Sequence, residues 1–460
     1  MKKYDVLIIG GGPGGYVAAI RSSQLGKKTA IVEASQLGGV CLNWGCIPTK
    51  ALLQNAHVFN VVNNANKFGI EVSGVKVNWG KMIKRSRDVA KRLSKGIEYL
   101  MKKNNVDYIP AYGKLVNNTT IETENLEGKR TQFKAESIII ATGARPKLFK
   151  SIDLDGKQII TSKEAMALEK QPKSLAIIGA GAIGVEFAHF YNSFGTDVTL
   201  IEALPNILPI EDETISKELE KIFKKNKMKI YTGSQVKNIE KRRSEVIIHL
   251  ESGETVIAEK ALISIGVQGN VEALGLETCK VSVDKSCIQV NEFMETSVPN
   301  IYAIGDVTGP PWLAHVASAE GITAVDHLAG LNPESMQYNN IPGCTYCYPE
   351  VASVGLTEKK AVAKGYKIKV GTFPFKGLGK AMAVGETDGF VKVIYDAKYG
   401  EMLGCHIIGA EATNLISEAV IARSLESTLH AVLKTIHPHP TLSEAIMEAT
   451  ADAIGEAIHI

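Results

Sequence analysis

The chain carries the same local pattern twice, with the two copies starting about 170 residues apart. In each copy a short apolar run ends in a glycine-rich turn, a helical stretch follows, and a second apolar run comes next. The runs occupy residues 4–10 and 28–34 in the first copy, and residues 174–179 and 197–203 in the second. Short buried strands that alternate with helices form parallel sheets, so each copy predicts a βαβ unit. We therefore expect an α/β protein with two Rossmann-like domains.

The glycine-rich turns have the spacing GxGxxG that is typical of dinucleotide-binding sites. Glycine lets the backbone approach a pyrophosphate, and the following helix directs N–H groups and the positive end of its dipole at the same group. A carboxylate that can hold ribose hydroxyls, Glu33 or Glu202, ends the second strand of each copy, 18 residues after the last glycine. Two such sites in one chain indicate electron transfer between two cofactors. The turns contain Gly10, Gly12, Pro13, Gly14 and Gly15 in the first copy and Gly179, Gly181 and Gly184 in the second.

The residues around Glu202 indicate which nicotinamide nucleotide the second site prefers. A carboxylate at this position favours the free 2′-hydroxyl of NAD, whereas NADP sites usually place an arginine nearby. Ala203 and Leu204 supply no cation, so we predict NAD. Asp306 ends another apolar run and has two interpretations: the cap of a turn, or a carboxylate that binds a polyol of a cofactor.

The stretch GGVCLNWGCIPTK contains Cys41 and Cys46, which are spaced too widely for a CxxC redox motif and lack companion ligands for zinc. No metal site is predicted. Residues five apart lie about 140° apart on an ideal helix, so a bond between the cysteines needs a distortion that Gly45 and Pro48 would allow. A strained disulfide is easily reduced, which suits a working redox pair. The alternative is two buried thiols that act as small hydrophobic residues.

The stretch HPHPTLSE presents His439 between two prolines, which fix the backbone and disfavour a helix. An imidazole held in this way can act as a general base near neutral pH, and Glu444 can orient it. Glu444 also completes a capping box with Thr441 before an amphipathic helix; both roles are possible if the carboxylate lies between helix end and imidazole. His437 is an alternative base, since spacing alone does not separate the two histidines.

Together these motifs resemble the pyridine nucleotide–disulfide oxidoreductase family, and within it the lipoyl branch. The resemblance spans the whole chain, in GGGPGG, GGVCLNWGCIPTK, IIIATGARP, IIGAGAIGVEF, IYAIGDV, LAHVASAEG, PEVASVGLTE and TIHPHPTLSEAIMEA. It implies an FAD-binding domain at residues 1–147, an NAD-binding domain at 148–268, a central domain at 269–339 that completes the FAD site, and a C-terminal α+β dimerisation domain at 340–460. FAD would be bound tightly but not covalently, and NAD⁺ and NADH would be co-substrates.

The resemblance also implies roles for single residues. Cys41 corresponds to the thiol that attacks the substrate, and Cys46 to the thiol that faces the flavin. His439, which would reach the site from the other subunit, corresponds to the base, with Glu444 as its partner. The sequence departs from the family at Trp44, where a small aliphatic residue is common. Further implied cofactor-binding positions are Lys50 and Glu186, which correspond to an ion pair beside the flavin ring, and Gly113, Thr142, Gly143, Gly266 and Ala314.

The implied activity is the reoxidation of protein-bound dihydrolipoamide to lipoamide, with electrons passing through a Cys41–Cys46 disulfide and FAD to NAD⁺. The implied partners are a second copy of the chain and the lipoyl domains and core subunits of 2-oxo acid dehydrogenase or glycine-cleavage complexes.

The nearest alternative function is that of an NAD(P)H-dependent disulfide reductase of the glutathione reductase type, against which Glu202 argues. Mercuric and large thioredoxin reductases need a C-terminal redox pair, whereas the last cysteine is Cys405. A function of a different class is also possible in principle: the chain could be a binding or assembly subunit whose flavin is structural and takes no part in catalysis.

The composition argues against several other classes of protein. Lys and Arg number 52 and Asp and Glu number 49, so the net charge of +3 gives no argument for a nucleic-acid or membrane partner. The 7 cysteines do not form a secreted disulfide framework, and Cys344 and Cys347 are interpreted as structural thiols at the start of a strand. The first apolar run stops at Gly10, too early for a signal peptide. We expect a cytoplasmic protein, or a mitochondrial-matrix protein if a transit peptide has been removed.

Overall fold

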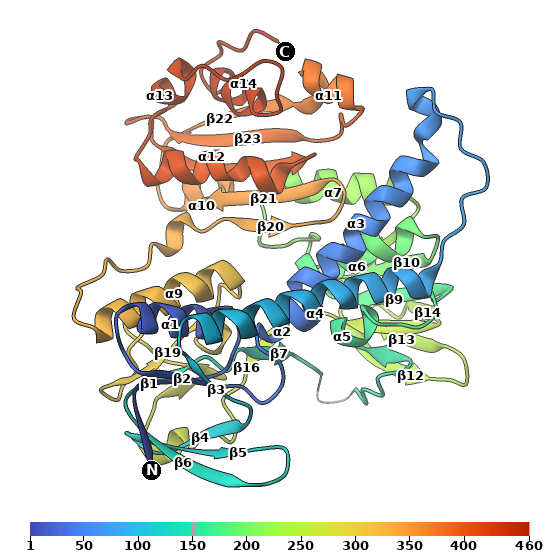
Figure 1. Ribbon diagram of the computed structural model, residues 1–460. Coiled ribbons are helices and arrows are strands. Elements are labelled where there is room, and N and C mark those ends of the chain that lie inside the picture. Colours follow the sequence, from blue (N-terminus) through green and yellow to red (C-terminus); the bar gives the residue numbers. More distant parts are fainter. Residues whose placement is uncertain (150–151, 460) are drawn as a thin grey trace. The chain divides into compact units, whose positions relative to one another are not determined.

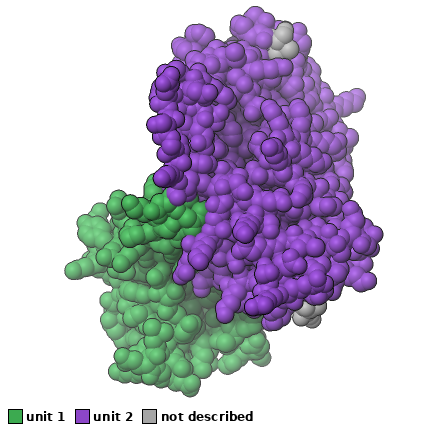
Figure 2. Space-filling view, turned by 90° about the vertical axis from the view of Figure 1, so that its right-hand side faces the viewer, with its two compact units in different colours: residues 1–52, 78–147, 266–336 green, residues 53–77, 148–265, 337–460 purple. Residues whose placement is uncertain are grey.

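The computed structural model describes residues 1–149 and 152–459, and the chain forms two compact units, each assembled from separate segments (Figure 2). The predicted division into four domains stays a prediction. Unit 1 contains Met1–Leu52, Asn78–Lys147 and Gly266–Met336, and unit 2 contains Leu53–Val77, Leu148–Ile265 and Gln337–Ile460.

A seven-stranded sheet forms the core of unit 1 (Figure 1). Its strands are β1 (Lys2–Ile9), β2 (Thr29–Val32), β3 (Asp107–Ile109), β4 (Tyr112–Asn117), β5 (Thr120–Glu124), β6 (Arg130–Ile140) and β19 (Ile301–Ala303). The order is β3-β2-β1-β6-β5-β4, and β19 pairs with the end of β6. All pairs are parallel except β4–β5 and β5–β6. The predicted first strand is the central β1, whose apolar residues are buried on both faces, as a parallel sheet covered on both sides requires.

Helices on this sheet bring the ends of distant segments together. The helices of unit 1 are α1 (Pro13–Gln24), α2 (Gly39–Trp44), the start of α3 (Cys46–Asn63), α4 (Trp79–Lys103), α8 (Leu276–Cys279), η2 (Gly305–Val307) and α9 (Ala314–Leu328). Helices α1 and α9 lie side by side, and a Cβ added at Gly321 would come within 2.8 Å of the Gly14 carbonyl oxygen. Glycine therefore allows the contact between the two helices. Two short pairs complete the unit: β7 (Ala144–Pro146) with β16 (Val267–Gly269), and β17 (Val283–Asp284) with β18 (Cys287–Ile288).

The second βαβ pattern lies in unit 2. Its parallel sheet has the order β11-β10-β9-β15-β8. The strands are β8 (Ile159–Ile160), β9 (Ser174–Ile178), β10 (Asp197–Ile201), β11 (Lys229–Tyr231) and β15 (Lys260–Ile263), and the helices are α5 (Ser162–Ala165), α6 (Ala182–Ser193) and α7 (Glu213–Lys225). A three-stranded antiparallel sheet is inserted between β11 and β15: β12 (Val236–Lys241), β13 (Val246–Leu250) and β14 (Thr255–Ala258).

The C-terminal part of unit 2 is the expected α+β structure. Its antiparallel sheet has the order β20-β21-β24-β23-β22. The strands are β20 (Gly343–Thr345), β21 (Glu350–Gly355), β22 (Ile368–Pro374), β23 (Phe390–Asp396) and β24 (Met402–Gly409). The helices are η3 (Tyr338–Asn340), α10 (Glu358–Ala363), η4 (Phe375–Gly377), α11 (Gly379–Val384), α12 (Ala412–Ser424), α13 (Leu429–Lys434) and α14 (Glu444–Asp452), and η1 (Ala65–Phe68) precedes them in the same unit.

The last helix differs from its predicted bounds. The sequence predicts a helix over residues 441–458, but α14 begins at Glu444 and ends at Asp452. The hydroxyl of Thr441 donates to the Pro438 carbonyl at 2.8 Å instead of capping the helix, and Gly455 adopts a left-handed φ of 75° beyond its end. The parts of the chain that the structure describes contain no helix that could cross a membrane.

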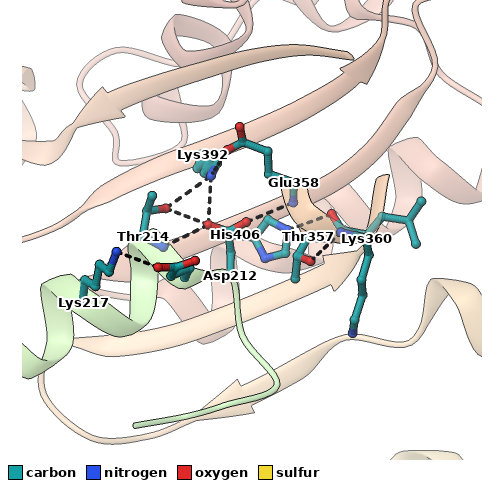
Figure 3. Close-up of polar contacts among 10 residues, drawn as sticks. Asp212, Thr214, Lys217, Thr357, Glu358, Lys360, Lys392 and His406 are labelled. Carbon is teal, nitrogen blue, oxygen red and sulfur yellow. Dashed lines mark hydrogen bonds and ion pairs between the residues drawn. The ribbon is translucent and has the colours of Figure 1, made fainter. Parts of the chain in front are cut away.

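A buried ion cluster joins the nucleotide-binding part of unit 2 to its C-terminal sheet (Figure 3). The Lys392 ammonium on β23 lies 2.8 Å from Asp212 and 2.6 Å from Glu358. Asp212 also accepts the backbone N–H of Thr214 at the start of α7 and that of Glu358 at the start of α10. Since the side chains of Lys392 and Asp212 are 2% and 3% exposed, one carboxylate neutralises a buried cation and caps two helices.

Candidate active site

The first glycine-rich turn is packed so tightly that only one of its positions is open. A Cβ at Gly10 would lie 2.1 Å from the Ala141 carbonyl oxygen, and one at Gly15 would lie 2.0 Å from the Gly10 carbonyl oxygen. At Gly12, the N-cap of α1, a Cβ would meet nothing within 4 Å, and Pro13 follows as the first helical residue. The free space therefore lies at the helix N-terminus, where a pyrophosphate would bind.

The carboxylates predicted for this site stand around the turn. Glu33 accepts the Gly11 N–H at 2.8 Å through Oε2 and the Ser35 N–H at 2.7 Å through Oε1. Asp306 lies in η2, and its side chain has no hydrogen-bond partner in the ranges 1–149 and 152–459. Burial and the neighbouring Glu320 raise the pKa of Asp306 to about 6. A partly buried carboxyl group without a partner fits the polyol ligand that the sequence suggested.

Other predicted cofactor-binding positions lie at the same edge. Thr142 and Gly143 follow β6, and the Thr142 backbone N lies 3.0 Å from the position of a Cβ on Gly10. Ala314 is the first residue of α9, whose Ala317 carbonyl oxygen would be 2.9 Å from a Cβ on Gly14. Thr142 and Ala317 thus lie beside the turn, and the predicted cofactor contacts of Thr142, Gly143 and Ala314 stay predictions.

Two of the predicted glycines have other surroundings. A Cβ at Gly113, on β4, would lie 3.2 Å from a methyl group of Val32, so this glycine serves packing within the sheet. Gly266 has a left-handed φ of 105° and accepts the Lys147 N–H at 2.9 Å. Their predicted contact with a cofactor stays a prediction.

The cysteine-containing segment lies directly on the dinucleotide turn. The Gly38 N–H donates to the Gly11 carbonyl at 2.7 Å, and a Cβ at Gly39 would lie 2.7 Å from Cα of Gly12. Both glycines have left-handed φ values, 93° and 56°, and α2 begins at Gly39. Neither contact is predicted from the sequence, although the adjacent glycines before the cysteines are a visible signal. The contact places the helix with Cys41 beside the site for a dinucleotide.

The helix is interrupted between the cysteines, which is the local distortion that a bond between them would need. Helix α2 ends at Trp44, Gly45 has φ −150° and ψ −115°, and Cys46 is the first residue of α3. Both cysteines are thiols in this structure, so the disulfide stays a prediction. Hydrogen bonding with Cys46 and burial raise the pKa of the Cys41 thiol, whereas the positive charge of Lys50 acts to lower it. The two thiols and the ammonium therefore interact, as a redox pair with an adjacent cation should.

An arginine that carries no motif supports the cysteine-containing helix. Arg87 on α4 donates to the Asn43 carbonyl at 2.6 Å, and its guanidinium lies 3.8 Å from the ring centroid of Trp44. A cation at the C-terminal end of α2 satisfies a free carbonyl and interacts favourably with the helix dipole. Trp44 therefore has a defined partner, which sequence reasoning could not identify because 43 residues separate the two positions.

The second glycine-rich turn repeats the geometry of the first one. A Cβ at Gly184 would lie 2.0 Å from the Gly179 carbonyl oxygen, and one at Gly181 would meet nothing within 4 Å. Glu202 accepts the Ala180 N–H at 2.7 Å and the Leu204 N–H at 2.9 Å. This arrangement matches that of Glu33 at the first turn, so the sequence duplication is a duplication of site geometry.

The predicted partner of Lys50 lies in unit 2. Glu186 is on α6, is 4% exposed, and accepts the Tyr346 N–H at 2.9 Å. Its predicted pairing with Lys50 stays a prediction. Cys347, which stands where the family commonly has threonine, is buried and donates its thiol to the Pro349 carbonyl. This contact agrees with the interpretation of Cys347 as a structural thiol.

The two candidate bases have different surroundings. His439 is 76% exposed, and its Nδ1 lies 2.9 Å from Oε1 of Glu444. His437 has only 8% of its side chain exposed, with Nδ1 3.0 Å from the Thr435 carbonyl. The other oxygen of Glu444 accepts the Thr441 N–H at 2.8 Å. Glu444 thus contacts both helix end and imidazole, and the exposed His439 is the histidine that a substrate can reach.

These contacts keep Glu444 ionised. Burial acts to raise the pKa of Glu444, but the hydrogen bonds from Thr441 and His439 hold this pKa below its ordinary value. An ionised carboxylate on Nδ1 orients an imidazole and stabilises its protonated form.

Comparisons with known proteins agree with this geometry. A family model described as pyridine nucleotide-disulphide oxidoreductase matches residues 4–321, and a model of the dimerisation domain of the same family matches residues 341–450. A protein from Rhizobium etli named dihydrolipoyl dehydrogenase is 47% identical and covers 100% of this chain and 99% of its own length. One with the same name from Bacillus subtilis is also 47% identical, over 99% of each chain.

Solved structures show the same fold. The crystal structure of LpdA from Mycobacterium tuberculosis has a TM-score of 0.92 and 25% identity, and covers 98% of this chain and 99% of its own. The HOCl-induced flavoprotein disulfide reductase RclA from Escherichia coli, in its Cu(II) complex, has a TM-score of 0.89 and 27% identity over 98% of this chain and 99% of its own. The chain therefore belongs to the pyridine nucleotide-disulphide oxidoreductase family.

Proposed function

We propose that this chain is a dihydrolipoyl dehydrogenase, which oxidises protein-bound dihydrolipoamide to lipoamide and reduces NAD⁺. The observation that supports this proposal best is the contact of Gly38 and Gly39, in the segment of the cysteine pair, with Gly11 and Gly12 of the first glycine-rich turn. Relatives with that name are 47% identical over essentially the full chain. Glu202, with no cation at Ala203 or Leu204, supports NAD over NADP and argues against a glutathione reductase.

The residues of unit 1 fit FAD as the resident cofactor. The open space at Gly12 would take the pyrophosphate, Glu33 the ribose hydroxyls, and the partnerless Asp306 a polyol hydroxyl. FAD supplies two-electron chemistry that connects a dithiol to a nicotinamide. Lys50 would stabilise negative charge beside the cysteines and the cofactor.

The thiol chemistry belongs to the chain's own residues. His439 removes a proton from one substrate thiol, and Glu444 stabilises the resulting imidazolium. The substrate thiolate bonds to Sγ of Cys41, the Cys41–Cys46 bond breaks, and Cys46 leaves as a thiolate. The second substrate sulfur then displaces Cys41 and closes the cyclic disulfide of lipoamide. Two electrons then remain on the reduced pair Cys41 and Cys46, and FAD held in unit 1 would supply the chemistry that connects this dithiol to NAD⁺.

The cysteine positions support this assignment of roles. Cys46 opens α3, an 18-residue helix, so its thiolate would be stabilised at the positive end of the helix dipole. Cys46 is therefore the better leaving group of the pair, which leaves Cys41 as the sulfur under attack.

The proposed assembly is a homodimer in which His439 serves the cysteines of the other subunit. The match to a dimerisation domain over residues 341–450 supports a dimer. Lipoyl domains and core subunits of 2-oxo acid dehydrogenase or glycine-cleavage complexes are the proposed partners, and the cytoplasm is the proposed location.

Steady-state kinetics with paired substrates test the activity. We expect turnover with dihydrolipoamide and NAD⁺. The rate with NADP⁺ should be lower by a factor on the order of a hundred or more, because the site has no cation for the 2′-phosphate. The rate with glutathione should be lower by a similar factor, because glutathione lacks a second thiol. A preference for NADP⁺ and glutathione would overturn the proposal, and no turnover of any disulfide substrate would favour an assembly subunit.

The variant Cys46→Ser tests the cysteine relay. It should abolish turnover of dihydrolipoamide, because the Cys41–Cys46 bond cannot form, while the flavin absorbance of the purified protein stays unchanged. Cys405→Ser, which alters a buried thiol far from the chemistry in sequence, is the matched control and should keep its activity. Full activity in the Cys46 variant would refute the relay.

A further inference from the structure

Helix α4, labelled in Figure 1, has a concentration of positive charge that the composition of the whole chain conceals. Its 25 residues include 9 Lys and Arg and only 2 acidic residues, a net charge of +7. The whole chain has a net charge of +3, so all other residues together carry −4. No contiguous block of cations marks this helix in the sequence, because its cations are interspersed with apolar residues at helical spacing.

Most of these cations have no carboxylate partner. The ion pair Lys84–Asp88 is 2.5 Å long, but six other exposed side chains of α4 form no ion pair with any residue in the described ranges. They are Lys81, Lys91, Arg92, Lys95, Lys102 and Lys103. Unneutralised cations along one helix repel each other, so a purely structural role does not explain them.

Helix α7 provides a comparison within the same chain. It is also strongly charged, with 4 lysines and 3 glutamates over its 13 residues. Three of its lysines form ion pairs one turn away: Lys217 with Glu213, Lys221 with Glu218, and Lys224 with Glu220. Helix α7 is thus an ordinary solvated helix with balanced charge, and α4 is not.

The exposed cations of α4 lie on one side of the helix. Lys84, Lys91, Lys95 and Lys102 follow at intervals of seven, four and seven residues, which keeps them within an arc of about 40° on a helix with 3.6 residues per turn. The buried residues of α4, including Ala90, lie on the other side. Tyr99, 64% exposed, stands between the cations, and an exposed tyrosine is a frequent anchor of protein interfaces.

The side of α4 that faces the sheet is fastened to the cysteine-containing segment. Arg87 donates to the Asn43 carbonyl and stacks on Trp44, and Ser94 donates to the Leu37 carbonyl at 2.8 Å. Arg85 donates to the Ala51 carbonyl on α3 at 3.1 Å. A partner that binds α4 is therefore held at a fixed position relative to Cys41 and Cys46.

We propose that the exposed basic side of α4 is the docking surface for an acidic face of the lipoyl-bearing carrier domain. This inference rests on the proposed function, since a substrate carried by a protein needs a docking surface near the cysteines. Complementary charge raises the association rate and fixes the orientation of the carrier. The helix is about 37 Å long, comparable with the diameter of a domain of fewer than 100 residues.

A folded acidic domain fits better than an extended polyanion. The residues outside α4 carry a summed charge of −4, so an extended nucleic acid or an anionic membrane would meet net negative charge beyond the helix. A small domain contacts the helix alone. Tyr99 and the 40% exposed Leu93 add apolar contacts that suit a protein surface.

Kinetics with free and carrier-bound substrate test the proposal. The variant K91E/R92E/K95E and wild type are assayed with free dihydrolipoamide and with a lipoylated, net-negative lipoyl domain, at 20 mM and 500 mM salt. We expect kcat/KM for the domain to fall at least tenfold at low salt, with a smaller loss at high salt because the Debye length shrinks from about 20 Å to about 4 Å. Turnover of free dihydrolipoamide should stay unchanged, and K91Q/R92Q/K95Q should show an intermediate loss.

The control variant K217E/K221E/K225E makes the same change of charge on the exposed lysines of α7 and should leave both substrates unaffected. An equal loss in this control, or an equal loss with free dihydrolipoamide, would overturn the proposal. So would binding of a DNA duplex or of phosphatidylserine vesicles that K91E/R92E/K95E abolishes while carrier turnover is retained. Absence of wild-type turnover with free dihydrolipoamide would instead refute the proposed function itself.

Discussion

At the scale of single residues, Glu444 shows how one side chain serves local structure and site chemistry together. Its two oxygens accept separate hydrogen bonds, one from the Thr441 N–H and one from Nδ1 of His439. The capping-box pattern correctly predicted the contact of Glu444 with the Thr441 N–H, but the Thr441 hydroxyl donates to Pro438 instead of capping α14. The sequence could not show this, because the alternative acceptor lies three residues before the predicted helix.

The variant Glu444→Gln separates the two roles. The amide oxygen can still accept the Thr441 N–H, but the negative charge on the imidazole is lost. We expect kcat/KM for dihydrolipoamide to fall roughly tenfold to a hundredfold, and the ascending limb of its pH profile to shift to lower pH, because the imidazolium is less stabilised. Thermal stability should be unchanged. A variant with normal kinetics and a lowered melting temperature would mean that Glu444 acts only at the helix.

Glu211 is a buried acid that no proposed chemistry uses. Its Oε2 has no hydrogen-bond partner among the residues of the described ranges, and burial raises its pKa to about 7, with Ser353 acting in the opposite direction. Because the folded-state pKa exceeds the ordinary value, the folded protein binds the proton more tightly between about pH 4.5 and pH 7. Stability should therefore fall as the pH rises through this window.

The variant Glu211→Gln cannot ionise and should lose much of this pH dependence. Relative to wild type it should gain stability on the order of 3 kcal/mol between pH 4.5 and pH 8, from a shift of two to three pKa units. Melting temperatures across this range measure the effect. Glu213→Gln, an exposed neighbour, should follow the wild-type curve, and a Glu211 variant that also follows it would contradict the prediction.

At the scale of elements, Asp212 is the N-cap of α7 and supplies an additional acceptor at the start of α10, whose own N-cap is Thr357. Its carboxylate accepts the N–H of Thr214 on one helix and of Glu358 on the other, while Lys392 neutralises its charge (Figure 3). Burial acts to raise the pKa of Asp212. The hydrogen bonds outweigh burial, the one from Lys392 having the largest effect among them, and lower this pKa to about 2. A local sequence pattern can predict that Asp212 caps α7, the helix that follows it. Its second contact, with the N–H of Glu358 on α10, arises only from the tertiary structure.

Removing this carboxylate should loosen all three elements together. In Asp212→Ala two helix N-termini lose a cap and the buried Lys392 loses a partner, which should cost about 3–5 kcal/mol of local stability. Hydrogen exchange of α7, α10 and β23 measures the loss. The double variant D212A/K392M, which removes the buried cation as well, should recover part of it. Unchanged exchange in D212A would show that Glu358 alone suffices for Lys392.

At the scale of the whole molecule, the proposed catalytic groups come from both compact units of the chain. Cys41 and Cys46 belong to unit 1, whereas His439 and Glu444 belong to unit 2. His439 is 76% exposed, which is unusual for a base that works in a site shielded from water. A partner subunit that covers this histidine would provide the shielding.

Mixed dimers test this arrangement. C46S and H439Q homodimers should both be inactive, but heterodimers contain one site with an intact cysteine pair and an intact base if the base comes from the other subunit. A random mixture made by co-expression should therefore regain about a quarter of the wild-type activity, since half of the dimers are mixed and each has one working site of two. No recovered activity would place His439 with the cysteines of its own subunit.

The sequence by itself determined the features that depend on local geometry. Strand periodicity and the spacing of glycines predicted both βαβ units, because a GxGxxG turn between a strand and a helix allows few backbone paths. A bond between Cys41 and Cys46 was predicted to need a local distortion that Gly45 and Pro48 would allow, and the structure has a helix break at Gly45. The carboxylates Glu33 and Glu202 were predicted at the ends of strands, where the structure has them.

Only the tertiary structure decided which distant segments meet. Arg87 stacks on Trp44, Asp212 caps α10, and the cysteine-containing segment binds the first dinucleotide turn through Gly38. The sequence names the partner in none of these contacts, although the adjacent glycines Gly38 and Gly39 were a signal for the last one, because each contact depends on which faces of separately predictable elements are buried together. Burial is a property of the packed chain, so it selects partners that spacing along the sequence leaves undetermined.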